Sequence, residues 1–457
     1  MTSASVEHTY RYSFSSNFVE KEKGSRLQLA TSGGSAEFPY FFQGQLKYPR
    51  LTGQLLRTLS KVVTTRFHIP PAMLRRVLAT KDPVITSGGG LIRFEGFSAC
   101  CSAYARVDLN PDAYVGVVTG QGTTNVDFNT RMRAALAQIR DDERIGLAIG
   151  TDEIALLRGA DQIVERRVSL PMRWLKGFVE IQAYQSRMER RAHLNKVETV
   201  RFLRSLPRTT AAKNVYWIVP AAGGLRLSQR EAPGAIRLAG IERLQILDDI
   251  APLADSLTVF ADERGDASEW ELRVGALALH LTLSAEVWRG FSGEGQVLAS
   301  LAGSDDNRLI ELVKGMLKWQ AEIHPEEFAQ NWNTTAEILR QTFAILGSRG
   351  LVGYDLSRSA YFHRELPFDL SLVEELHPRL KNARKIVESG GVQILRQTKT
   401  FTEAEVPGSD VTHRVRLSED GDRCTCSWHA KHQGARGPCK HILATMILTE
   451  PKNADEG

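Results

Sequence analysis

The chain lacks any long hydrophobic run. No uninterrupted apolar stretch approaches the ~20 residues that span a bilayer. The first residues, MTSASVEHTYRYSFSS, show no basic head followed by an apolar segment. We therefore expect no membrane span, no secretory signal and a cytoplasmic protein. With 457 residues, 42% of them hydrophobic and 24% charged, the chain can bury a sizeable core and form about three domains.

The sequence also lacks the motifs of common catalytic sites. It contains no GxxxxGK[ST] phosphate loop, no GxSxG elbow and no HExxH pair, and the glycines of SGGGLIRF lack the lysine that a phosphate loop needs. Asp108, Asp112 and Asp127 are scattered carboxylates, which we expect to be exposed. We therefore predict that the protein is not an enzyme and has no catalytic or cofactor-binding residues beyond a metal site.

Cysteine is scarce, with five residues in all, and an odd number this small excludes a disulfide framework. Cys100 and Cys101 are neighbours in FSACCSAYARV, a segment that we predict to be a buried strand. Free cysteine in such a strand packs as a small hydrophobic side chain. The other three cysteines lie together near the C-terminus and need another explanation.

The apolar pattern predicts an α+β protein of several domains, with mixed helices and antiparallel strands. Strand-like runs such as RIGLAIG, EWELRVG and ALALHLTLS occur without the regular strand–helix alternation that builds a parallel sheet. We predict an N-terminal α+β domain at residues 1–143 and a mixed α+β domain with basic helices at 144–284. A helical region follows at 285–385, then a C-terminal ββα zinc-binding module at 386–450 and a frayed tail at 451–457.

The helical region ends in two short strands, LVGYDL and SAYFHREL, which follow the amphipathic helix TTAEILRQTFAILGSRG. Helices followed by a terminal hairpin have the arrangement of a winged helix, a shape that binds DNA or docks on proteins. The last helix offers Arg340 and Arg349 as its basic residues.

Positive charge is concentrated in two segments, although the net charge is only +5. Residues 161–213 contain twelve Lys/Arg against five Asp/Glu, and residues 379–440 contain twelve against seven. Such asymmetry permits contact with nucleic acid or an acidic partner, and an ordinary solvated helix face explains it equally.

The three remaining cysteines form a metal-ligand pattern with one histidine. Cys424-x-Cys426, twelve residues and Cys439-x-His441 supply three thiolates and an imidazole, the donor set of a structural zinc site. Calcium and magnesium would need oxygen ligands, and four protein ligands leave no position for a catalytic water. We therefore predict one structural Zn²⁺ ion.

The surrounding sequence suggests how these ligands are presented. THRVRLS and CTCSW form a predicted hairpin, the loop AKHQGARGP turns the chain back, and a helix follows Pro438. His429 and His432 lie in the loop and are expected to be exposed, not ligands. A redox role remains an alternative, but its usual CxxC pair beside a βαβ unit is missing.

CxCx(n)CxH after two strands and before an apolar helix resembles the SWIM zinc finger, above all in its ending PCKHILA. The resemblance covers roughly residues 390–450 and implies that Cys424, Cys426, Cys439 and His441 bind the metal. More loosely, CCSAYARVDLNPDAY, GQGTTNVDFNTRMRAAL and GSRGLVGYDLSRSAYFHRELPF resemble bacterial SWIM-family proteins that accompany MoxR-type AAA+ ATPases and von Willebrand factor A-domain proteins. A partner of one of these two kinds is what that resemblance implies.

We therefore expect a zinc-binding, non-catalytic adaptor that uses a SWIM-type finger to bind a protein partner, DNA or both, within a MoxR ATPase-linked bacterial system. The alternative is a nuclease- or transposase-related enzyme that uses the finger for targeting. Such an enzyme would need clustered carboxylates, and the sequence shows no recognisable set.

Overall fold

Antiparallel strands and helices share the chain in the computed structural model, which confirms the predicted α+β class. The structure describes residues 17–21, 24–28, 40–67, 83–118, 120–125, 128, 130–150, 153–158, 161–166, 170–208, 214–291, 295, 297–302, 307–317, 319–332, 334–366, 377–409 and 411–449. Asp127 and the predicted frayed tail, 451–457, lie outside these residues.

The chain forms two compact units. An N-terminal unit comprises Met1–Trp174, Met188–Gly290 and Arg364–Leu366, and a C-terminal unit comprises Leu175–Arg187, Phe291–His363 and Pro367–Gly457. The four domains and their boundaries predicted from the sequence stay a prediction, because compactness alone does not test them.

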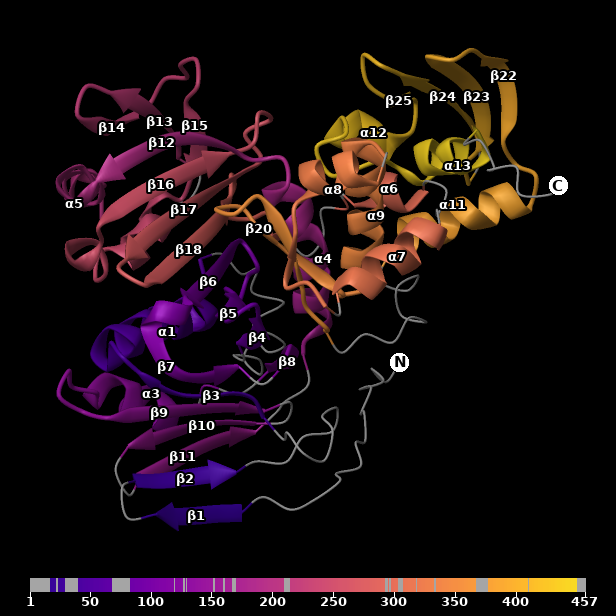
Figure 1. The fold of residues 1–457 in the computed structure, drawn as a ribbon. Coiled ribbons are helices and arrows are strands. Elements are labelled where there is room, and N and C mark those ends of the chain that lie inside the picture. The colour runs from indigo at the N-terminus through magenta and orange to yellow at the C-terminus, as the bar shows by residue number, and fades with distance from the viewer. Residues whose placement is uncertain are drawn as a thin grey trace. The chain divides into compact units, whose positions relative to one another are not determined.

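An antiparallel sheet of eight strands dominates the N-terminal unit (Figure 1). Its strands, in spatial order, are β12 (Glu189–Asn195), β16 (Ser256–Ala261), β17 (Ala267–Val274), β18 (Leu277–Ser284), β6 (Ala103–Leu109), β5 (Leu91–Phe97), β4 (Val84–Gly88) and β8 (Gly122–Asn125). Strands far apart in sequence meet where β6 pairs with β18.

Smaller sheets and helices complete this unit. A five-stranded sheet has the order β11 (Asp161–Arg166), β10 (Glu153–Arg158), β9 (Ile145–Gly150), β3 (Tyr40–Leu46) and β7 (Tyr114–Val118). The other sheets contain β14 (Gly224–Ser228), β13 (Val215–Ala221) and β15 (Ile236–Ala239), and β1 (Asn17–Lys21) with β2 (Gly24–Gln28). The helices are α1 (Pro49–Thr64), α3 (Thr130–Gln138) and α5 (Lys196–Ser205), with 3-10 turns η2 (Pro111–Ala113), η3 (Ile241–Leu247) and η4 (Ala251–Leu253).

The eight-stranded sheet has one apolar face and one charged face, because side chains alternate along each strand. Paired residues on the apolar face include Phe94, Val107, Leu279 and Leu272. Helices α1 and α5 cover this face, and the ring of Phe202 on α5 stacks on Trp270 with ring centroids 5.8 Å apart. The opposite face is described below.

The C-terminal unit begins with part of α4 (Met172–Gln185) and continues after α6 (Leu298–Ala302) as a helix–strand–helix–helix–strand–strand segment. The elements of this segment are α7 (Asn307–Leu317), β19 (Glu322–Ile323), α8 (Pro325–Asn331), α9 (Ala336–Ser348), β20 (Val352–Asp355) and β21 (Ala360–His363). Strand β21 lies between β19 and β20 in the sheet. This order and pairing are those of a winged helix.

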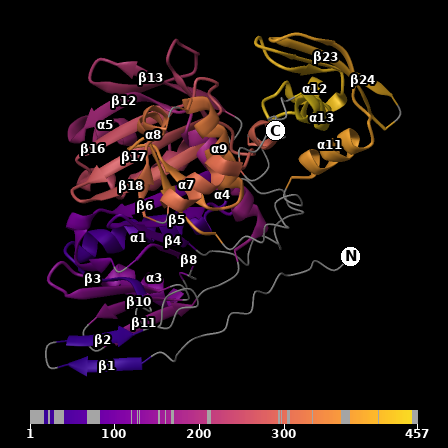
Figure 2. The ribbon, with the colours of Figure 1, turned by 45° about the vertical axis from the view of Figure 1, so that its right-hand side comes forward.

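The last part of the chain forms a four-stranded sheet and three helices. The strands are β22 (Gln393–Gln397), β23 (Phe401–Pro407), β24 (Thr412–Ser418) and β25 (Arg423–Cys424), and the helices are α11 (Pro378–Glu388), α12 (Ser427–His432) and α13 (Lys440–Thr449). Figure 2 shows α12 and α13 beside β23 and β24. One hydrophobic core contains Ile442 and Leu443 of α13, Leu380 of α11 and Leu298 of α6. The cysteine-rich segment is therefore packed into the C-terminal unit.

The position of Cys100 and Cys101 differs from the prediction. Cys101 is buried as expected, but Cys100 and Cys101 lie in the turn between β5 and β6 and not in a strand. Cys101 has a φ of 56° there, a left-handed conformation that a strand does not contain.

Among the described residues, no helix is long and apolar enough to cross a membrane.

Candidate metal centre and buried charge network

Three local elements bring the four predicted ligands together. Strand β25 pairs with β24 through Val415 and Cys424, so the predicted hairpin holds the first ligand. Cys426 caps the N-terminus of α12, whose first turn therefore begins at a ligand. Cys439 directly precedes α13, and His441 lies in its first turn.

The ligand atoms of Cys424, Cys426, Cys439 and His441 all lie within 4.8 Å of one another, and all four residues are buried. His441 directs Nδ1 at the sulfurs, 3.7 Å from Cys424 Sγ and 3.9 Å from Cys439 Sγ. Its Nε2 is buried without a hydrogen-bond partner among the described residues, and its ring packs on His413 at 4.5 Å. Nδ1 is therefore the imidazole atom available to a metal.

Backbone N–H groups surround the sulfurs. Cys424 Sγ accepts from the N–H of Cys426 at 3.4 Å, Cys426 Sγ from that of His429 at 3.4 Å, and Cys439 Sγ from that of Ile442 at 3.5 Å. Hydrogen bonds of this kind favour a thiolate over a thiol, since the charged acceptor gains more from each donor.

The lowered pKa of Cys439 also favours a thiolate. A hydrogen bond from Cys424, with further donors at His441 and the Ile442 N–H, lowers the pKa of Cys439 to about 4 against the effect of burial. A hydrogen bond to Cys439 and burial together raise the pKa of Cys424. A divalent metal bound here would supply the positive charge that favours ionisation of all three thiols.

The donor set fits one zinc ion, which takes three thiolates and an imidazole in tetrahedral geometry. These four groups would fill the coordination sphere of the ion, so its role here would be structural. His429 and His432, both half-buried, do not belong to the cluster.

Trp428 and Arg379 hold the segment between the ligand pairs in place. The predicted loop, residues 430–438, is wrong in its first three residues, because Ser427–His432 form helix α12 and Gln433 ends that helix with a φ of 45°. Arg379 on α11 lies over the Trp428 ring at 4.7 Å and donates to the carbonyl oxygens of Arg436 and Pro438 at 2.7 and 3.0 Å. This contact joins residues about fifty positions apart, so no local sequence pattern indicates it.

The basic residues around the metal centre are mostly engaged. Arg414 donates to Glu405 at 3.1 Å, and Arg416 donates to Glu403 at 2.9 Å, across the β23–β24 pair. The Arg436 guanidinium lies 5.8 Å from the centre of the Trp428 ring. Arg414 and Arg416 are thus paired with carboxylates, and Arg436 is packed against Trp428.

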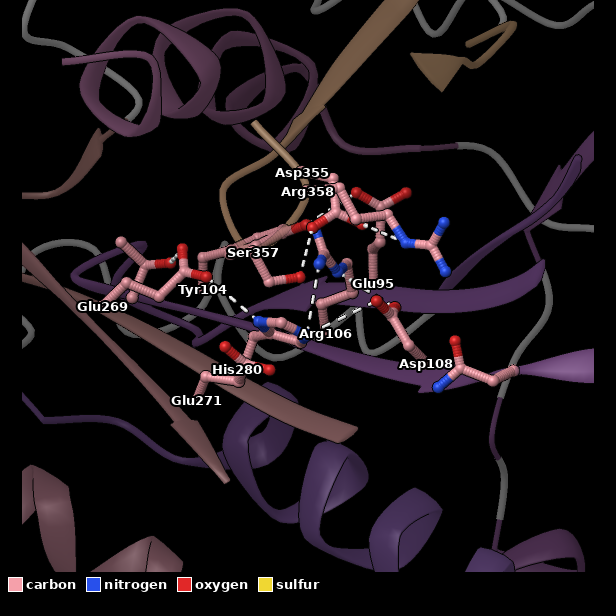
Figure 3. A network of polar contacts seen from close by, with 12 residues as sticks. Glu95, Tyr104, Arg106, Asp108, Glu269, Glu271, His280, Asp355, Ser357 and Arg358 are labelled. Carbon is pink, nitrogen blue, oxygen red and sulfur yellow. Dashed lines mark hydrogen bonds and ion pairs between the residues drawn. The ribbon is translucent and has the colours of Figure 1, made fainter. Parts of the chain in front are cut away.

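The charged face of the eight-stranded sheet contains a buried network that we did not predict from the sequence (Figure 3). Glu95, Arg106, His280 and Glu271 pair in turn across four strands, and each is at most 3% exposed. Asp108, which we predicted to be exposed, is 4% exposed and lies 2.9 Å from Arg106, whereas Asp112 is exposed as expected. Charged residues at every second position, as in RFE, RVD and EWELR, are the signal that could have revealed this face.

Each carboxylate of this network has a cationic or hydroxyl partner. Glu95 accepts hydrogen bonds from Tyr104 and Arg364, both at 2.7 Å, and Glu269 accepts from Thr282 at 2.8 Å. His280 lies 3.1 Å from Glu269 and 3.4 Å from Asp108.

The protonation state of His280 follows from these neighbours. Burial and the charge of Arg106 lower the pKa of His280, but hydrogen bonds to Asp108 and Glu269 outweigh them and raise it to about 9. The network is therefore a charge-balanced part of the sheet, with His280 as a cation near neutral pH.

One side of helix α9 packs into the core of the C-terminal unit. Phe343, Ile345 and Leu346 on α9 are buried in the core of the C-terminal unit. Gly347 lies so close to Gln182 of α4 that an added Cβ would be 1.3 Å from Nε2. Helix α4 therefore covers this side of α9, whereas Ile338 and Arg340 near the start of α9 are exposed.

Comparisons with known proteins leave the family open. No protein-family model matches the chain, and no curated protein matches it, so the resemblance to the SWIM finger stays a prediction. Proliferating Cellular Nuclear Antigen from Entamoeba histolytica is a similar solved structure, 12% identical, with a TM-score of 0.35 over 54% of this chain and 98% of that chain. A TM-score this low establishes neither a shared fold nor a shared function.

Proposed function

We propose that this protein is a zinc-binding, non-catalytic adaptor whose C-terminal finger binds a protein partner. The observation that carries the proposal is the Cys₃His cluster, in which four ligand atoms lie within 4.8 Å of one another. A site filled by four protein ligands stabilises its surroundings and leaves no position for substrate or water. The resemblance to SWIM proteins supports a MoxR-type AAA+ ATPase or a von Willebrand factor A-domain protein as partner.

The charges of the finger favour a protein over DNA as its target. Arg414 and Arg416 pair at 3.1 and 2.9 Å with Glu405 and Glu403, carboxylates that are only 37% and 18% exposed, and Arg436 packs on Trp428. A phosphate-binding surface needs several unpaired cations at neighbouring positions. Lys431, Lys440 and the exposed Arg423 remain beside the cluster, and we expect them to give only weak DNA affinity.

The metal assignment is tested by zinc content and by proteolysis. We expect about one zinc per purified chain and its loss in Cys439→Ser, with new protease cleavage within residues 410–447, because metal binding is coupled to local folding. Cys100→Ser serves as the matched control, since Cys100 lies outside the cluster. Unchanged zinc content in Cys439→Ser would refute the site.

The adaptor role is tested separately. Purified protein is mixed with a MoxR-type ATPase and, in parallel, with a von Willebrand factor A-domain protein from the same bacterium, and complex formation is measured by calorimetry. We expect binding to one of them and its loss after zinc is removed by a chelator. Zinc binding without either interaction would retain the metal site and reject the adaptor role.

A further inference from the structure

Helices α1 and α5 present a row of basic side chains on the side away from the sheet. On α1, Arg50, Arg57 and Lys61 are exposed, and α1 contains no acidic residue. Their spacings of seven and four residues place them on one side of a helix, over about 16 Å of its length. On α5 and just after it, Arg201, Arg204 and Arg208 are exposed at spacings of three and four. These six residues are called the basic face below.

The two rows are continuous with each other. The short helix η3 contacts both α1 and α5, so all three lie on the same side of the sheet. Burial and the charge of Asp249 raise the pKa of Asp248, just after η3, and the positive charges of Arg208, Lys61 and Arg204 act against this rise. Side chains from both helices therefore converge on one part of the surface.

The apolar sides of both helices are already used. Leu55, Leu59 and Val62 of α1 are buried, and Phe202 of α5 stacks on Trp270 of the sheet. The burial of these side chains holds the two helices on the sheet and turns the charged sides outward. The basic face is therefore presented by rigid elements and not by a loop.

Asp248 and Asp249 follow η3 beside the basic face, and the ion pairs at this surface are weak. Lys61 lies 3.5 Å from Asp249 and Arg50 lies 3.5 Å from Asp141, in pairs whose side chains are more than half exposed. Surface pairs of this kind contribute about 0–1 kcal/mol and exchange readily for another anion. Arg57 and Arg201 form no ion pair with any residue in the part of the chain that the structure describes.

We propose that the basic face binds the phosphate backbone of a duplex nucleic acid. A linear row of arginine and lysine with no aromatic and little apolar interleaving suits regularly spaced phosphates, which need cations and little else. A protein interface would need a desolvated apolar centre, and a membrane surface would need apolar anchors. The exposed apolar side chain of these two rows is Val197. This proposal goes beyond the protein-binding finger and does not depend on it.

The test measures the affinity of the full-length protein for fluorescein-labelled DNA and RNA duplexes of random sequence by anisotropy, at 50 to 200 mM NaCl. Arg57→Gln with Arg201→Gln removes one cation from each helix. Two lost phosphate contacts should lower the slope of log K against log salt by about 1.8 and the affinity at 0.1 M salt by about 60-fold. Asp249→Asn should strengthen binding severalfold, because it frees Lys61.

Lys431→Gln with Lys440→Gln removes the same charge from the finger and should leave duplex affinity unchanged. A preference between the DNA and RNA duplexes identifies the natural ligand and supports the proposal in either direction. The proposal is overturned if the wild type binds neither duplex at 50 mM salt, or if the arginine double variant binds like the wild type. It is overturned equally if only the finger variant loses affinity, or if anionic vesicles bind and duplexes do not.

Discussion

Raising the pH should destabilise the N-terminal unit through His280. This side chain is 1% exposed and is held as a cation between Asp108 and Glu269, which raise its pKa from 6.5 to about 9. The folded protein therefore binds the His280 proton more tightly than the unfolded chain does. Its stabilising effect is complete below pH 6.5 and is lost as the pH rises through about 9.

The size of the effect follows from the two pKa values. A difference of about 2.5 units corresponds to about 3 kcal/mol in the free energy of unfolding, of which about 2 kcal/mol disappears between pH 7 and pH 9. Urea unfolding followed by tryptophan fluorescence at half-unit steps from pH 6 to pH 9.5 measures this loss as a falling midpoint.

Two variants separate His280 from other titrating groups. His280→Gln should unfold at lower urea and should lose the fall between pH 7 and pH 9. His193→Gln, which removes an exposed histidine of the same unit, should keep the wild-type pH profile. A midpoint that does not change with pH in the wild type, or a fall that persists in His280→Gln, would show that His280 is not held as a cation.

Three further substitutions test the packing of the C-terminal unit. Gly347→Ala should destabilise the protein by about 1–3 kcal/mol, because the new methyl group collides with the buried side chain of Gln182. Gly315→Ala on α7 meets no atom within 4 Å and should instead stabilise by up to about 1 kcal/mol, so opposite shifts in the melting temperature are expected. Arg379→Ala should accelerate the removal of zinc by a chelator, because it loses two hydrogen bonds and the contact with Trp428. An unchanged release rate would show that Arg379 does not brace the metal site.

The metal centre was the most predictable part of the protein because its determinants are local. Cys424, Cys426, Cys439 and His441 lie within eighteen residues, and the hairpin and helix that carry them are short-range structures. Donor chemistry limits what such a set can bind, so spacing and residue type were enough to identify the cluster. The structure around the cluster was less predictable. Strand β23 was not predicted from FTEAEVP, and α12 occupies the start of the predicted loop.

The charged face of the large sheet shows the opposite case. Arg93, Glu95, Arg106 and Asp108 alternate with apolar residues as in any half-exposed strand, and the usual expectation is that such charges face water. Their burial depends on strands up to 174 positions apart, such as β6 and β18, pairing so that each charge meets an opposite one. Periodicity in the sequence placed these residues on one face but did not determine what that face contacts.

The winged-helix segment was likewise predictable as a set of elements and not as a surface. The amphipathic pattern of α9 and the hairpin after it could be read from residues 334–366, but the packing of Gln182 against Gly347 joins positions 165 apart. Sequence alone indicated the α+β class and the Cys₃His cluster, since these depend on composition, periodicity and short spacing. Tertiary structure decided which charges are paired, which helix sides are covered and which arginines remain exposed, because those outcomes depend on contacts between distant segments.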